Sequence, residues 1–65
     1  MIKQHKRYER GARVRLLEDV EMYDITYLKG HEFTITGEDA IRGLDLEDDE
    51  GHRLCETRFV KMELV

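Results

Sequence analysis

The chain has 65 residues with 15 acidic and 11 basic side chains, which gives a formal net charge of −4 at pH 7. A chain of this length holds one domain and one modest core, because domains near this size bury only about 60% of the surface that their unfolded chains expose. The single cysteine, Cys55, excludes an intrachain disulfide and favours a reducing, cytoplasmic compartment. No apolar run approaches the roughly 20 residues that span a bilayer, so no membrane partner is expected.

Charge is unevenly distributed, with a basic beginning and an acidic remainder. The first fifteen positions hold one acidic residue, Glu9, beside the basic residues Lys3, Lys6, Arg7, Arg10, Arg13 and Arg15. Residues 1–10 contain few apolar side chains, so we expect a flexible basic N-terminal segment there and a folded domain over residues 11–65. Basic side chains of this kind also neutralise phosphates, which leaves a nucleic-acid-associated protein as the alternative function.

The first half of the chain predicts two strands separated by a long loop. Apolar and polar side chains alternate over residues 12–17, which is typical of a strand. A helix is compatible with the spacing of residues 18–29, but their aspartates and β-branched side chains disfavour it, and we expect a long loop bent back on itself. Gly30 supplies the conformational freedom for a diverging turn, and alternation resumes in a second strand over residues 31–36.

The second half of the chain alternates in the same way. We expect a turn at 37–40, a third strand at about 41–47, a tight hairpin at 48–51, a fourth strand at 52–56, a short irregular turn at 57 and 58, and a last strand at 60–64. Gly51 suits the left-handed position of a G1 bulge, and Gly43 suits a bulge or a close backbone approach. Alternation places five side chains in the core: Phe33, Ile35, Leu44, Leu46 and Leu54.

The order of these elements resembles that of SH3-like small β-barrels of bacterial or phage type. The most specific piece is the segment from Ile25 to Ile35, Ile-Thr-Tyr-Leu-Lys-Gly-His-Glu-Phe-Thr-Ile, which is similar to the diverging turn of SH3 domains. The resemblance covers roughly residues 12–65. It implies an all-β fold, a five-stranded SH3-like barrel with a long first loop and a short helical turn before the last strand.

The function of eukaryotic SH3 domains lies in an aromatic groove, completed by a proline, that grips polyproline helices. Here residues 41–44 read Ile-Arg-Gly-Leu where those domains have paired tryptophans, and residues 56–59 contain neither proline nor tyrosine. The resemblance therefore does not extend to the polyproline-binding groove. It implies a small non-enzymatic protein interaction or regulatory module whose partner is another protein.

The long first loop holds Met22, Tyr23 and Tyr27, and it flanks the open face of SH3-like barrels, near Arg42 of the third strand. Exposed methionine, tyrosine and arginine are typical of the centre of a protein interface, so we expect these four residues to form the binding surface. A second interpretation is equally compatible with the sequence, in which Tyr23 and Tyr27 cover the open end of the barrel.

No pattern in the sequence predicts catalysis, a cofactor or a metal ion. His52 and Cys55 combine two residue types that bind zinc, but positions three apart in a strand project to opposite faces and cannot share one ion. The acidic residues from Asp45 to Glu50 lack the spacing of a calcium loop, and we expect them to keep the hairpin solvated. The expected site therefore has no catalytic residue and no metal ligand.

Overall fold

The computed structural model describes residues 7–65, and its regular structure over these residues consists of antiparallel β-strands. Lys3 and Lys6 of the predicted basic segment lie outside the described residues. The strands are β1 Arg13–Leu16, β2 Val20–Met22, β3 Ile25–Tyr27, β4 Glu32–Asp39, β5 Gly43–Glu47, β6 Arg53–Leu54 and β7 Met62–Leu64. The predicted all-β class is confirmed, and so is the absence of a helix from residues 18–29.

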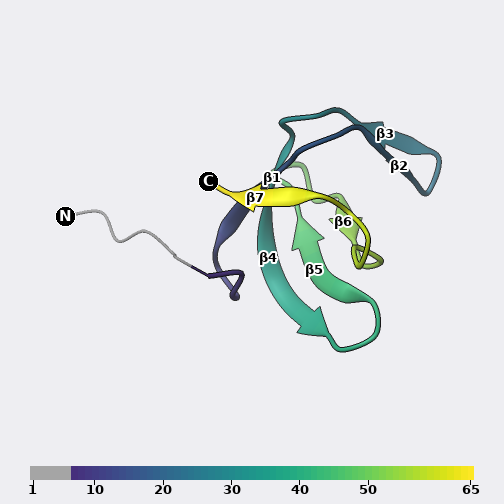
Figure 1. Cartoon of the computed structure of the whole chain (residues 1–65). Coiled ribbons are helices and arrows are strands. Elements are labelled where there is room, and N and C mark those ends of the chain that lie inside the picture. The colour runs from purple at the N-terminus through teal and green to yellow at the C-terminus, as the bar shows by residue number, and fades with distance from the viewer. Residues whose placement is uncertain (1–6) are drawn as a thin grey trace.

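Five of the strands form one sheet in the order β6-β5-β4-β1-β7, and β2 pairs with β3 in a separate hairpin. Figure 1 shows the sheet curling around the core, with the β2–β3 hairpin extending from one end. β6 and β7 are the two edges of the sheet, and no strand pair in residues 7–65 joins them. The fold is therefore compatible with a small barrel-like arrangement, without the closure that the sequence analysis expected.

The long strand β4 links the two halves of the sheet. Its first half pairs with β1, and it continues past a register shift between Ile35 and Gly37 to pair with β5 as far as Asp39. The prediction of a turn at residues 37–40 was wrong, because this bulge bends the strand instead of ending it. The third strand consequently begins at Gly43, later than its expected start at residue 41.

The C-terminal elements are shorter than predicted. β6 spans two residues instead of residues 52–56, and β7 begins at Met62 instead of residue 60. The short helical turn that the resemblance implies before the last strand is instead a single β-turn, in which the Val60 amide donates to the Thr57 carbonyl at 3.0 Å. No further bond of this type follows, so the turn does not extend into a helix.

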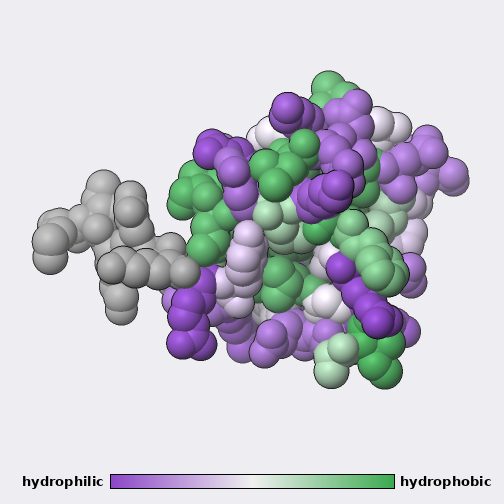
Figure 2. All heavy atoms as spheres, viewed as in Figure 1, coloured by the Kyte–Doolittle hydropathy of each residue, from purple (hydrophilic) through white to green (hydrophobic). Residues whose placement is uncertain are grey.

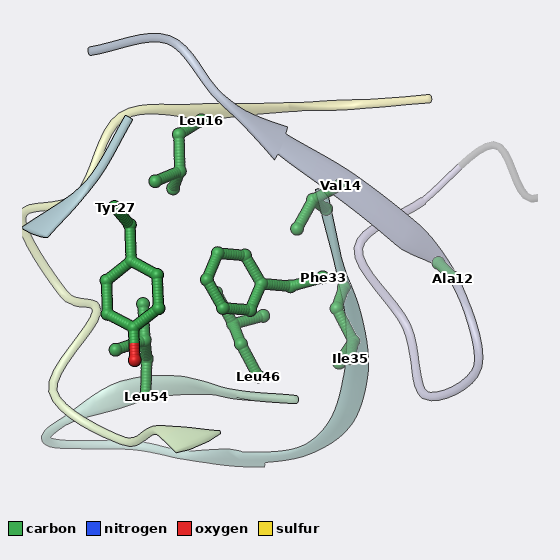
Figure 3. Close-up of a cluster of buried hydrophobic side chains, with 8 residues drawn as sticks. All are labelled: Ala12, Val14, Leu16, Tyr27, Phe33, Ile35, Leu46 and Leu54. Carbon is green, nitrogen blue, oxygen red and sulfur yellow. The ribbon is translucent and has the colours of Figure 1, made fainter. Parts of the chain in front are cut away.

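The core lies inside the curled sheet, with Phe33 at its centre (Figure 3). It consists of Ala12, Val14, Leu16, Tyr27, Phe33, Ile35, Leu46 and Leu54, which are all buried. Four of the five predicted core residues are among them, and the fifth, Leu44, is half-buried and packs against the cluster. The alternation of β1 and β4 produces this arrangement, because side chains of one parity along each strand point inward.

Candidate functional site

A groove of about 510 Å³ lies between the β2–β3 hairpin and the turns that flank β5 and β7. We call it the hairpin groove. Its lining consists of residues 18–22, residues 41 and 42, residue 56 and residues 58–60. In Figure 1 these three segments are the hairpin, the turn between β4 and β5, and the connection from β6 to β7.

The first wall is the hairpin, whose two-residue turn consists of Tyr23 and Asp24. Their φ angles are +55° and +64°, which identifies the turn as the type I′ form that matches the twist of paired strands. Asparagine and glycine usually occupy such positions, so Tyr23 holds a conformation that costs free energy for its residue type. At the base of the hairpin, a carboxylate oxygen of Asp19 accepts from the Lys29 amide at 2.8 Å.

The second wall is the turn between β4 and β5, which the side chain of Asp39 shapes. One of its carboxylate oxygens accepts from the Ile41 amide at 2.8 Å and from the Arg42 amide at 3.0 Å. Both bonds lower the pKa of Asp39 below its usual range, and the Arg42 amide makes the larger contribution. Gly43 follows with a φ of +98° and ends the turn. The turn therefore leaves the Ile41 side chain exposed to solvent, with 74% of the residue's surface accessible.

The third wall is the turn from Thr57 to Val60, which the buried Thr57 fixes to β5. Its hydroxyl accepts from the Leu44 amide at 2.8 Å and donates to the Leu44 carbonyl at 2.6 Å. The backbones approach so closely here that a Cβ on Gly43 would lie 2.8 Å from the Arg58 nitrogen. Anchoring of this segment turns Phe59 outward, and 85% of its surface is exposed.

Large apolar side chains thus line a groove whose rim is charged. The guanidinium of Arg58 lies over the Phe59 ring, 5.2 Å from its centroid, and most of the ring still contacts solvent. Figure 2 shows hydrophobic atoms exposed among charged ones on the same face as Figure 1, including a cluster over the turn between β4 and β5. Val20, Met22 and Val60 are half-buried at the floor. Such a surface suits an apolar contact surrounded by polar ones.

Acidic side chains outnumber basic ones around the groove. Its rim has the carboxylates of Glu18, Asp19, Glu21 and Glu56 against the guanidinium groups of Arg42 and Arg58. Within residues 7–65, Glu18, Glu21 and Glu56 form no ion pair. The electrostatic potential in the groove therefore favours a partner with positive charge.

The structure brings together two of the four predicted binding residues. Met22 and Arg42 line the hairpin groove. Tyr23 is 59% exposed at the tip of the hairpin, and it does not line the groove. Tyr27 is buried in the core, where its ring packs edge-on against Phe33 at 5.4 Å between centroids. The two tyrosines thus differ, since Tyr27 covers the core and only Tyr23 is exposed.

The basic residues of the alternative function are spread over several places. The guanidinium of Arg13 donates to the carboxylates of Glu32 and Asp49, each at 3.1 Å. Both bonds raise the pKa of Arg13, and the bond to Asp49 makes the larger contribution. Arg15 pairs with Glu63 of β7. Arg7 and Arg10 line a separate hollow beside β4. Because Arg13 and Arg15 already form ion pairs with carboxylates, these two arginines should attract phosphates only weakly.

A second cluster of polar side chains surrounds Asp48, at the hairpin between β5 and β6. One carboxylate oxygen lies 3.0 Å from His31 Nε2 and 2.9 Å from His52 Nδ1. The other accepts from the amides of Glu50 and His52. Burial alone would raise the pKa of Asp48, but the bonds from His52, His31 and the two amides outweigh it and hold that pKa well below its usual range.

The Asp48 cluster also affects Tyr27, whose ring contacts both imidazoles. Burial, with a smaller contribution from the charge of Asp48, raises the pKa of Tyr27. No three histidine, cysteine, aspartate or glutamate side chains within residues 7–65 have an arrangement that could hold a metal ion. Cys55 lies apart from His52, in a hollow beside Thr36 and Arg53. The cluster is best explained as the support of a tight turn.

Sequence reasoning missed the two exposed large apolar residues of the groove, Ile41 and Phe59, and the pairing of His31 with Asp48. A signal for Ile41 existed, since Asp39 precedes Ile41 by two residues and can cap a turn there. No local signal links His31 to Asp48, because only the folding of β4 against β5 brings them together.

Comparisons with known proteins do not add a family to this description. No family model, no curated protein and no solved structure matches the chain. Within the part of the chain that the structure describes, no helix has the length and apolar character needed to cross a membrane.

Proposed function

We propose that the chain is an SH3-like barrel of the cytoplasm that acts as a non-enzymatic protein interaction module, with the hairpin groove as its docking surface. The observation that supports this function is the exposure of Phe59 and Ile41 on two neighbouring walls of one groove, both across from β2. Neither side chain contributes to the core, and exposed apolar side chains that gather at a groove are typical of a docking site.

The order of the strands supports the SH3-like assignment. β4 lies between β1 and β5, and β7 joins the far side of β1, as expected if the β2–β3 hairpin is the long first loop of the family. Gly30 has a φ of +92°, and its amide donates to the Leu16 carbonyl, at the end of β1, at 2.8 Å. This turn beside the end of β1 is at the position of the diverging turn in the family pattern.

The free energy available from the groove is sufficient for a specific contact. Full burial of an isoleucine or phenylalanine side chain contributes about 1.5–3 kcal/mol. Each of Ile41 and Phe59 thus changes a dissociation constant by roughly 10-fold to 150-fold when it is completely covered. Two such anchors, surrounded by polar groups, account for a moderate affinity without any catalytic group.

The test compares groove variants with a matched surface variant. Ile41→Ser and Phe59→Ser each remove an apolar side chain from the groove, and Leu28→Ser removes one that is 64% exposed elsewhere. Proteins retained by the immobilised full chain are identified, and the dissociation constant of each recombinant candidate is then measured. We expect both groove variants to weaken binding at least tenfold and the control to leave it unchanged.

Equal binding by all three variants would refute the groove as the docking surface. Measurement at several salt concentrations separates the nucleic-acid alternative, because phosphate binding falls steeply with ionic strength and an apolar contact does not. A duplex DNA or RNA probe that binds with a steep salt dependence, unaffected by Phe59→Ser, would replace the proposed function with the alternative.

A further inference from the structure

We propose that the hairpin groove receives an extended, basic segment of a partner protein, which pairs with the free edge of β2 as an additional strand. This inference rests on the proposed function and specifies the chemistry of the partner. Three observations support it: an unpaired strand edge that faces the groove, apolar anchors across from that edge, and an excess of negative charge around it.

The free edge follows from the register of the hairpin. Met22 pairs with Ile25 directly beside the two-residue turn, so these two residues exchange the hydrogen bonds that close it. In an antiparallel pair, hydrogen-bonded and non-hydrogen-bonded positions alternate, so the next pair, Glu21 with Thr26, is not hydrogen-bonded. The amide and carbonyl of Glu21 therefore point away from β3, and those of Thr26 point away from β2.

The groove lies on the side of β2 that has this free edge. All three residues of β2 line it, and no residue of β3 does. Figure 1 shows β2 on the inner side of the hairpin, toward the connection from β6 to β7. A strand added to β2 would lie about 4.8 Å from it, and its side chains could then contact Ile41 and Phe59 across the groove.

Charge selects the kind of strand. Glu21 lies in β2, Glu18 lies two residues before that strand, and Glu56 also lines the groove; none of these carboxylates is in an ion pair within residues 7–65. A segment with lysine or arginine at alternate positions would neutralise them. Symmetric pairing of β2 with β2 of a second copy would instead place Glu21 near its own equivalent, and like charges across a strand pair are destabilising. The occupant is therefore a basic segment of another protein.

The experiment begins with a display library of random twelve-residue peptides, selected on the immobilised full chain. We expect the retained peptides to be rich in lysine, arginine and β-branched residues, and to contain no proline in their central positions. The tightest peptide is then synthesised with and without N-methyl groups on alternate backbone nitrogens. Methylation in one of the two possible phases should weaken binding at least tenfold, because it removes the amides that would pair with Glu21.

Two variants of the chain provide a matched pair. Glu21→Pro removes the amide that points into the groove without removing a bond to β3, and Thr26→Pro removes the corresponding amide on the opposite edge. We expect the first to weaken binding at least tenfold and the second to change it less than twofold. Glu21→Lys leaves the backbone intact, and it should weaken binding of the basic peptide by a similar factor. If a proline disturbs the hairpin, Glu21→Lys still tests whether the negative charge of the groove attracts the basic peptide.

Other outcomes separate this inference from the proposed function. If Phe59→Ser abolishes peptide binding while methylation in both phases and Glu21→Pro do not, docking at the groove stands and strand pairing is refuted. Selection of proline-rich peptides would refute it in the same way. A dimer in solution that Glu21→Pro dissociates would make a second copy the occupant and refute the partner. Peptides whose binding is indifferent to Phe59→Ser and Ile41→Ser would refute both.

Discussion

The carboxylate of Asp48 is the most informative place to perturb stability, because a single buried side chain holds the hairpin between β5 and β6. Only 2% of this side chain is exposed, and it accepts from two backbone amides and two imidazoles. Asp48→Ala removes all four interactions. Asp48→Asn keeps an oxygen for the amides of Glu50 and His52, removes the negative charge, and replaces the oxygen that accepts from the two imidazoles with an NH2 donor.

The expected loss for Asp48→Ala is about 3 kcal/mol. A net hydrogen bond contributes about 1 kcal/mol, and bonds to a charged group contribute more, but the half-exposed rings of His31 and His52 can turn to water in the variant. For a domain of this size, that loss lowers the melting temperature by roughly 12–24 °C. Asp49→Ala is the matched control: its side chain is 80% exposed, and a surface pair such as that with Arg13 contributes about 1 kcal/mol or less.

The pH dependence has a definite sign. The pKa of Asp48 is lower in the folded chain than in the unfolded chain, where it lies near 4. The contribution of the Asp48 carboxylate to the free energy of unfolding is therefore present above about pH 4, and it declines as the pH falls toward the pKa of Asp48 in the folded chain. The difference in stability between the natural chain and Asp48→Asn should shrink from pH 6 to pH 2. Thermal unfolding followed by circular dichroism measures it, and a constant difference, or an Asp48→Ala variant that melts within 2 °C of the natural chain, would refute the reasoning.

Two further substitutions test the packing. Phe33→Ala should lower the free energy of unfolding by about 3–5 kcal/mol, because it empties the centre of the core, and an unchanged urea midpoint would contradict the assignment of that core. Thr57→Val should cost about 2 kcal/mol, because the amide and carbonyl of Leu44 lose their shared hydroxyl, whereas Thr57→Ser should keep most of the stability. A larger loss in the serine variant than in the valine variant would show that the methyl group of Thr57, and not its hydroxyl, holds the turn.

The sequence predicted the parts of the fold that depend on local rules. Gly30 and Gly51 were identified as turn positions because glycine alone adopts positive φ without cost, and both have φ near +90° in the structure. The β2–β3 hairpin was predicted only as a bent loop, since its turn uses Tyr23 and Asp24 instead of the glycine or asparagine that marks such turns. In this hairpin the tertiary context decides against local preference.

The limits of prediction were greater for the candidate site. Met22 and Arg42 were assigned to the binding surface from their residue types, and both line the groove. Ile41 and Phe59 were not, because Ile41 was predicted to begin the third strand and Phe59 to precede the last one, and only the anchoring of the two turns shows that they point outward. β4 could not be predicted in full either, because its continuation past Gly37 depends on a bulge that no pattern of residues predicts.

The position of β7 at the edge of the sheet determines the order in which the structure can assemble. β1 near residue 14 meets β7 near residue 64, whereas β4 and β5 are joined by a short turn. The cost in chain entropy rises with the length of the loop that must close, so the β4–β5 hairpin should form early and β7 should dock late. Every residue of β7 is only half-buried, so the amides of this edge strand should exchange before those of the central strands β1 and β4 under native conditions. The edge that completes the sheet can therefore open while the central strands stay paired.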